Sequence, residues 1–239
     1  MISNSEIKLI TSLQQKKYRA LHESFVAEGE KLIRDLWLSG MIATHLFTTS
    51  EVSDTPIDPV VINERALHKI SSLKNANGWL AVFRMPEPKP IPVSGLILAL
   101  DGVRDPGNLG TILRLCDWYG VGHVVCSCDT VDLYNPKVVQ ASMGSIARVQ
   151  LHYQDLPQLL AEDHRPVFGA FLEGTPIQKT QLPSDAILVM GSEAHGLRSE
   201  VSQVIEQAIT IARNSESSGA ESLNVAMATG IILHEWFRG

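Results

Sequence analysis

Three short stretches of the sequence combine glycine with amide, carboxylate or guanidinium side chains, which are groups that bind and orient charged ligands. They are Asn108 to Arg114 (NLGTILR), Gly191 to Gly196 (GSEAHG) and Ser222 to Asn224 (SLN). Each stretch follows an apolar run or opens an apolar helix, so each is expected at the end of a secondary-structure element. Polar loops in such places can converge on one site at the carboxyl edge of a parallel sheet.

Each of these side chains also has an ordinary structural interpretation. Asn108, Ser222 and Asn224 are residue types that cap helix N-termini, and Glu193 could serve only its own turn. The apolar neighbours of Arg114 predict a largely buried helix, in which an arginine needs an anionic partner such as a phosphate. Capping does not account for an arginine six residues after an asparagine, nor for a glutamate between glycines. The combination of the three stretches therefore indicates a functional site.

The elements that must position these residues fall into two predicted domains. Residues 1–85 alternate short helix and strand patterns, which is typical of a small α/β unit. Four prolines in 86–93 favour an extended linker. Residues 94–239 alternate strands and helices, which predicts an α/β fold with a mostly parallel sheet. Strands are expected at 23–27, 45–49, 60–62, 79–83, 96–100, 124–127, 149–151, 166–171, 186–190 and 208–211. Helices are expected at 4–13, 31–39, 64–72, from 108, at 136–147, 156–161, 199–207 and 221–237. The polar stretch from Asn214 to Gly219 is expected to be a loop that moves on binding.

Composition excludes several classes of protein. The chain has 239 residues, 44% of them hydrophobic, which is enough for a sizeable core. It has no apolar run of the roughly 20 residues that a membrane helix needs and no hydrophobic signal core at its N-terminus, so a cytoplasmic location is expected. Cys116, Cys126 and Cys128 lack disulfide or zinc spacing, which predicts buried, reduced thiols and no metal.

The charge of the chain bears on nucleic-acid binding. A net charge of -6 argues against a protein that coats nucleic acid non-specifically, so any RNA contact must be localised. Lys16, Lys17 and Arg19 surround Tyr18, an arrangement that could bind a phosphate backbone and stack a base. A solvated helix end explains the same residues equally well.

The set NxGxxxR, GxExxG and SLN, in this order and with these gaps, resembles the three motifs of the SpoU/TrmH family of RNA ribose methyltransferases, part of the SPOUT superfamily. The resemblance covers about residues 95 to 237. The N-terminal part, with Lys17 to Arg19, Phe25 to Gly29 and Lys31, is similar to the ribosomal-protein-like substrate-binding domain that many members carry. Where members often have a proline after the strand before the third motif, this chain has Ala212 to Asn214.

The resemblance implies a C-terminal trefoil knot, S-adenosylmethionine bound in it, a homodimer, and methyl transfer to a ribose 2′-hydroxyl of structured RNA, either tRNA or rRNA. The implied catalytic residues are Asn108, Arg114, Glu193, Ser222 and Asn224. The implied cofactor-binding residues are Gly191, Ser192, Glu193, Ile209, Thr210, Ile211, Leu223 and Asn224. RNA would be bound by Lys16, Lys17, Arg19 and Arg114. Because a guanidinium is a poor proton acceptor at neutral pH, we expect Arg114 to act electrostatically on the target phosphate and the developing alkoxide.

Two other functions remain open at this point. The first is a non-catalytic RNA-binding protein with the same fold. Such a protein would not need four polar groups in apolar surroundings, namely Asn108, Arg114, Glu193 and Asn224. The second is a dinucleotide-binding enzyme with an ordinary sheet, disfavoured because the chain has no GxGxxG fingerprint.

Overall fold

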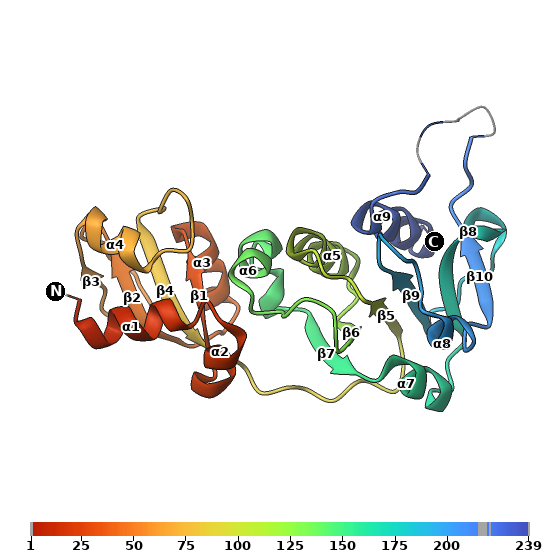
Figure 1. Cartoon of the computed structure of the whole chain (residues 1–239), viewed down its shortest axis with the longest axis horizontal. Helices are drawn as coiled ribbons and strands as arrows, with labels where there is room; N and C mark the ends of the chain where they lie inside the picture. The colour runs from red at the N-terminus through yellow and green to blue at the C-terminus, as the bar shows by residue number, and fades with distance from the viewer. Residues whose placement is uncertain (1, 215–218, 220, 239) are drawn as a thin grey trace. The chain divides into compact units, whose positions relative to one another are not determined.

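The computed structural model describes residues 2–214, 219 and 221–238, and it divides into two compact units (Figure 1). Unit 1 comprises Met1–Glu87 and Asp132–Arg148, and unit 2 comprises Pro88–Val131 and Val149–Gly239. Residues 132–148 lie within the range expected for the second domain, yet they pack with unit 1.

Unit 1 is a four-stranded sheet in the order β1-β4-β2-β3. Side chains alternate along its strands: Val26 and Val82 belong to one buried cluster, whereas Phe25 and Phe83 stack on the opposite face, where Tyr134 joins them. The strands are β1 (Ser24–Glu28), β2 (Ala43–Thr48), β3 (Val60–Val61) and β4 (Trp79–Arg84). The helices are α1 (Asn4–Ser12), α2 (Lys16–His22), α3 (Glu30–Leu38), α4 (Glu64–Ile70) and α6 (Pro136–Ser142), with a 3-10 turn η1 (Ser145–Ala147).

Unit 2 is a six-stranded sheet in the order β10-β8-β9-β5-β6-β7, and all of its strand pairs are parallel. The prediction of an α/β fold with a mostly parallel sheet is confirmed. The strands are β5 (Leu96–Asp101), β6 (His123–Ser127), β7 (Gln150–Gln154), β8 (Val167–Pro176), β9 (Ala186–Gly191) and β10 (Gln207–Thr210). The helices are α5 (Pro106–Tyr119), α7 (Leu156–Glu162), α8 (Ser199–Ser202) and α9 (Val225–Trp236), with a 3-10 turn η2 (Ile177–Lys179).

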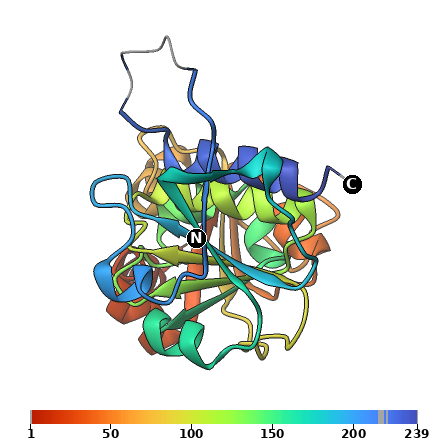
Figure 2. The same ribbon diagram turned by 90° about the vertical axis from the view of Figure 1, so that its right-hand side faces the viewer.

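Helices cover both faces of the unit 2 sheet. On one face α7 and α8 pack on a cluster that includes Ile97, Ile187 and Val189. On the other face α5 and α9 lie side by side (Figures 1 and 2). There the rings of Phe168 and Trp236 pack edge to face, with their centres 5.1 Å apart. The inner strands β5, β6 and β9 are buried on both faces, which explains why they read as largely continuous apolar runs rather than alternating ones.

Several element boundaries differ from the prediction for identifiable reasons. The helix expected at 136–147 ends at Ser142, because Met143 and Gly144 take positive φ angles of 50° and 95°. The helix expected at 199–207 ends at Ser202, because Glu206 donates its N–H to Val167 and leads into β10. The helix α2 was not predicted. Cys128 is exposed, whereas Cys116 and Cys126 are buried as expected. Most of the loop expected at 214–219 lies outside the described residues.

Two histidines on neighbouring strands of unit 2 make its stability sensitive to acid. His123 Nδ1 and His152 Nε2 lie 3.1 Å apart. Partial burial lowers the pKa of both rings, helped by Lys89 at His123 and by His123 at His152. The folded state therefore favours neutral rings, and the unfolded chain binds more protons once the pH falls below about 6.5.

We therefore expect the stability that unit 2 gains from keeping both rings neutral to be complete above about pH 6.5. It should be lost as the pH falls below that value. His152→Gln should flatten the pH dependence between pH 7.5 and 5.5. Urea unfolding of wild type and variant at three pH values measures this, with exposed His164→Gln as control. Equal losses of stability on acidification in wild type and His152→Gln would contradict it.

Candidate active site

The start of α5 leaves the side chain of Asn108 available for other contacts. Asp105, not Asn108, is the N-cap: its Oδ1 accepts the Asn108 N–H at 2.8 Å, and Pro106 begins the helix. The capping interpretation of Asn108 is therefore wrong. Its amide lies beyond the carboxyl end of β5 and can bond to residues of other loops.

Hydrogen bonds join one residue from each of the three motifs. Asn108 donates through Nδ2 to the Glu193 carboxylate, and its Oδ1 accepts a bond from Asn224 Nδ2 at 2.9 Å. Asn224 is also the N-cap of α9, since its Oδ1 accepts the N–H groups of Ala226 and Met227 at 3.0 and 3.3 Å. The capping bonds orient the Asn224 amide, which in turn orients Asn108. The three side chains thus form one connected unit.

The second motif is a tight turn closed on itself. Ser192 and Gly196 exchange two backbone hydrogen bonds of 3.0 and 2.9 Å, and Ser192 Oγ accepts the His195 N–H at 3.2 Å. A Cβ atom built on Gly191 would lie 2.3 Å from the carbonyl carbon of Gly196. Glycine is required at position 191 because two backbone segments approach each other there. The turn presents the exposed Glu193 near its tip.

The carboxyl ends of β8 and β10 add a second surface of exposed backbone. Their register shifts so that residues 170–174 bulge out of β8, and Thr210 Oγ1 donates to the Leu172 carbonyl at 3.0 Å. Ile209 is buried, while Leu172 and Leu223 are 74% and 50% exposed. Backbone groups beside exposed leucines suit a ligand that has both a flat apolar base and polar groups. S-adenosylmethionine is a ligand of this kind.

Arg114 and Ser222 lie outside the hydrogen-bonded unit. Arg114 is exposed on α5 and makes no hydrogen bond or ion pair with the described residues. The expectation that Arg114 lies on the buried side of its helix is wrong, because Leu109, Ile112 and Leu113 form that side. Ser222 is exposed and likewise has no hydrogen bond to the part of the chain that is described.

The three cations of the N-terminal segment have different surroundings. Lys16 and Lys17 are exposed at the start of α2, and Lys17 Nζ lies 4.7 Å from the centre of the Tyr18 ring. Arg19 is buried and donates to the carboxylate of Asp132 and to two backbone carbonyls of residues 13–14. Arg19 therefore holds unit 1 together, and its guanidinium does not face solvent as an RNA-binding residue would.

Sequence reasoning missed an ion pair beside the second motif. Asp101 is buried at the end of β5, and Arg198 donates to it from its backbone N–H and from Nε at 2.8 and 2.7 Å. The hydrogen bond with Asp101 raises the pKa of Arg198. Arg104 and then Ser127 lower the pKa of the neighbouring Asp129. An aspartate ending an apolar strand is a possible sequence signal, but nothing in the sequence pairs it with position 198.

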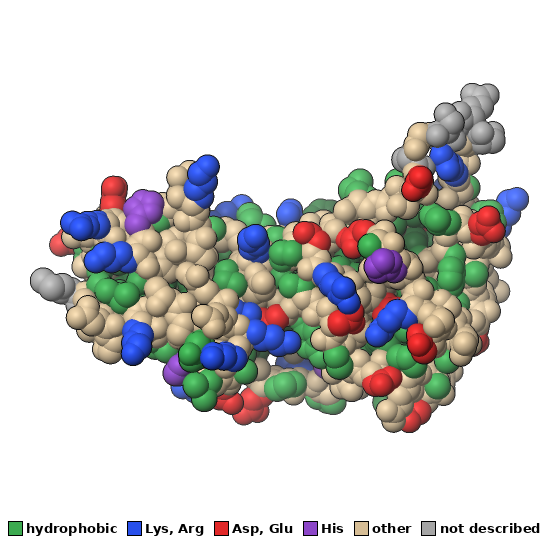
Figure 3. Space-filling view, in the orientation of Figure 1, with side chains coloured by type: hydrophobic (Ala, Val, Ile, Leu, Met, Phe, Trp, Pro, Cys, Tyr) green, Lys and Arg blue, Asp and Glu red, His purple; other side chains and the backbone are tan. Residues whose placement is uncertain are grey.

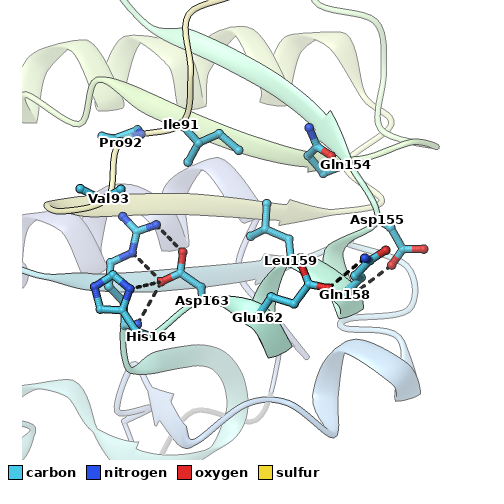
Figure 4. Close-up of a pocket in the computed structure, with 11 residues that line it drawn as sticks. Ile91, Pro92, Val93, Gln154, Asp155, Gln158, Leu159, Glu162, Asp163 and His164 are labelled. Carbon is cyan, nitrogen blue, oxygen red and sulfur yellow. Dashed lines mark hydrogen bonds and ion pairs between the residues drawn. The ribbon is translucent and has the colours of Figure 1, made fainter.

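A separate cavity of about 400 Å³ runs along α7 (Figure 4). Several of its polar groups already have partners: Arg165 Nε donates to Asp163 at 2.8 Å, and Gln158 donates to Glu162 at 2.9 Å. None of its lining residues belongs to the three motifs, so it is not the candidate site.

Residues 2–214, 219 and 221–238 contain no group of three His, Cys, Asp or Glu side chains arranged to hold a metal ion. No helix among them has the length and apolar character needed to cross a membrane.

The motifs lie in a region with known relatives. Residues 95–234 match the SpoU rRNA methylase family, and residues 4–81 match the MRM3-like substrate binding domain. The chain is 28% identical to the 23S rRNA (guanosine(2553)-2′-O)-methyltransferase RlmP of Bacillus subtilis, over 97% of this chain and 95% of that protein.

Solved structures agree in fold over the whole length. A TrmH-family protein from Porphyromonas gingivalis is 38% identical with a TM-score of 0.89, covering 100% of this chain and 99% of that one. An AdoMet-bound rRNA methyltransferase from Sinorhizobium meliloti is 29% identical with a TM-score of 0.85, covering 100% and 96%. With a family match over more than half of its length, the chain belongs to the SpoU/TrmH family of S-adenosylmethionine-dependent methyltransferases.

Proposed function

We propose that this protein transfers a methyl group from S-adenosylmethionine to a ribose 2′-hydroxyl of structured RNA, either rRNA or tRNA. The observation that carries the proposal is the hydrogen-bonded unit of Asn108, Glu193 and Asn224, which joins three motifs distant in sequence. A relative of similar length, RlmP, is named as a 2′-O-methyltransferase of 23S rRNA, which makes rRNA the first substrate to test.

The cofactor would be held by backbone of the turn at Gly191 and Ser192, by the end of β10 at Ile209 to Ile211, and by Leu223. When bound, S-adenosylmethionine supplies an electrophilic methyl group on a sulfonium. Glu193 and Asn224 are held in place through Asn108, so the polar groups beside the cofactor need no reordering when it binds.

Arg114 would act on the RNA. Its guanidinium has no partner among the described residues, remains charged at all physiological pH values, and presents a fork of donors that fits a phosphate. We assign it the binding of the target phosphate and the stabilisation of negative charge that develops on the 2′-oxygen, while the hydroxyl proton leaves to water. Ser222 would donate a hydrogen bond to the ligands from its exposed position before α9.

The test uses labelled S-adenosylmethionine with rRNA and tRNA transcribed without modifications, followed by digestion to nucleosides. Label in a 2′-O-methyl nucleoside supports the proposal and identifies which kind of nucleoside is modified. Cofactor and RNA binding without transfer would instead support a non-catalytic RNA-binding protein. Label in a base would overturn the ribose assignment.

RNA binding by unit 1 is expected to depend on Lys16 and Lys17. On the face seen in Figure 3, Lys and Arg side chains are dispersed, and acidic side chains lie among them over unit 2, so RNA would contact this face through local groups of cations. Lys16→Glu with Lys17→Glu should weaken binding and reduce the slope of log Kd against log salt concentration by about 2. Exposed Lys8→Glu with Lys69→Glu is the control. Equal slopes in both variants would contradict the expectation.

We propose a homodimer formed through the outer surface of α5 and α9. Trp118 on α5 is 83% exposed and Met227 on α9 is 62% exposed, although α9 is apolar along most of its length. A large exposed aromatic beside an apolar helix is typical of a protein interface.

Trp118→Asp is expected to weaken self-association by about 30-fold to 1,000-fold. This corresponds to the loss of about 2–4 kcal/mol that follows removal of one central aromatic residue from an interface. Sedimentation velocity at several concentrations measures the change. The control is Leu38→Asp, which alters an apolar side chain on α3 that is 76% exposed. A monomeric wild type, or an unchanged dimer in Trp118→Asp, would refute this interface.

The proposed fold includes the trefoil knot at the C-terminal end. In support, β10 pairs with β8, yet α9 returns to pack on β9 and η2, where Trp236 Nε1 donates to the Pro183 carbonyl at 2.9 Å. A crystal structure whose chain trace is unknotted would overturn it. We also propose a cytoplasmic location, which fractionation of cells expressing the protein would test.

A further inference from the structure

The turn that presents Glu193 is attached at both ends to one buried residue of β5. At its start, Gly191 pairs with Asp101 in the register of β9 and β5. At its end, Arg198 donates to the Asp101 carboxylate from its backbone N–H, from Nε and from a terminal guanidinium nitrogen, at 2.8, 2.7 and 2.6 Å. Asp101 is 1% exposed, so these bonds form largely out of water. One residue therefore fixes the base of the turn, through its backbone pairing with Gly191 and through its side-chain carboxylate at Arg198.

Asp101 also begins the segment that carries Asn108. After Asp101 come Gly102 and the buried Val103, and then Asp105 caps α5 and receives the Asn108 N–H. Gly102 donates its own N–H to Ser127 Oγ at 2.8 Å. One residue, Asp101, thus stands at the origin of both segments whose side chains meet in the Asn108–Glu193 hydrogen bond.

A second carboxylate, that of Asp129, also lies near the Arg198 guanidinium. Asp129 Oδ1 lies 4.0 Å from Arg198 and accepts a bond from Ser127 Oγ at 2.7 Å, while its Oδ2 accepts from Arg104 at 2.7 Å. The Arg198 side chain is 48% exposed. Its interactions are directed at the ends of β5 and β6, which border the site.

We propose that Arg198 is a positioning residue for methyl transfer: by binding Asp101 it fixes the turn at residues 191–197, and so fixes where Glu193 meets Asn108. This inference rests on the proposed function for its catalytic consequence and on the geometry alone for the ordering of the turn. Arg198→Ala keeps the backbone donor to Asp101 but removes the guanidinium donors, so the buried carboxylate loses hydrogen bonds. Arg198→Lys restores the positive charge with an ammonium group in place of the planar fork of donors.

The first experiment measures the turn without using activity. Hydrogen–deuterium exchange of wild type, Arg198→Ala and Arg198→Lys should show the hydrogen-bonded amides of Ser192 and Gly196 exchanging at least about 10-fold faster in the alanine variant, with the lysine variant between. Amides of β5 and β9 should be unchanged. Arg238→Ala, which removes an exposed pair with Glu235, is the control. Unchanged exchange at the turn, or faster exchange throughout unit 2, would overturn the proposal.

The second experiment measures transfer. Arg198→Ala should lower kcat by about 10-fold to 100-fold, as expected for a displacement of about 1 Å, and leave the KM for RNA within about twofold. In a Glu193→Gln background the same substitution should change kcat by less than about twofold, because Arg198 acts through Glu193. A full, multiplicative loss in that background would refute the route through Glu193. If wild type transfers no methyl to RNA, the proposed function fails, while the exchange experiment still decides whether Arg198 orders the turn.

Discussion

Replacing Arg114 with alanine is expected to lower kcat for methyl transfer by about 10²-fold to 10³-fold, the usual effect of removing one donor that stabilises developing charge. The fold should not suffer, because Arg114 is exposed on α5 and has no hydrogen bond or ion pair to the described residues. Cofactor affinity should stay within about twofold of wild type. Single-turnover transfer of labelled methyl, together with calorimetric titration of S-adenosylmethionine, measures both quantities.

The lysine variant identifies which property of Arg114 matters. Arg114→Lys keeps the charge but loses the planar fork of donors. Measurable activity would show that charge at this position is sufficient, whereas a loss equal to that of alanine would assign the effect to the fork. Thr111→Ala, an exposed change one turn earlier on α5, is the control. Wild-type kcat in Arg114→Ala would contradict the assigned role.

The architecture of unit 2 could be predicted because its strands carry their own signal. Apolar runs such as 96–100 and 186–190, separated by helical patterns, are typical of a parallel sheet, and both runs form central strands. Ends of elements were less predictable where partners decide them. Residues after Ser202 leave their helix because Glu206 bonds to β8, a contact invisible to local periodicity.

For the side chains of the candidate site, too, the sequence predicted some contacts and missed others. Motif spacing predicted that Asn108, Glu193 and Asn224 would lie together, and they share hydrogen bonds. Spacing did not show that Asp105 caps α5, nor that Arg19 is buried against Asp132, over a hundred residues away. Such contacts depend on how segments distant in sequence pack, and a single sequence carries no direct record of that.

Gly191→Ala is the second change with a large expected effect, about a 10²-fold loss of affinity for S-adenosylmethionine. A Cβ atom there would lie 2.3, 2.5 and 2.6 Å from backbone atoms of Gly196 and Leu197. Backbone cannot swing aside as a flexible side chain can, so the turn must move by about 1 Å to relieve the contact. A displacement of that size in a positioned site costs about 10²-fold in reaction rate, and we expect an effect of similar size on cofactor affinity.

Titration calorimetry and thermal unfolding of the same samples separate loss of the site from loss of the fold. Gly122→Ala is the control, since a Cβ atom there meets nothing within 4 Å. If Gly191→Ala binds cofactor as wild type does, the turn can yield without consequence, and backbone of residue 191 does not hold the cofactor. If affinity falls while the melting temperature stays close to that of wild type, the close approach of the two backbone segments serves binding rather than folding. Because Gly191 also pairs with Asp101, that outcome would place the origin of the Glu193 turn, and not only its tip, within the binding site.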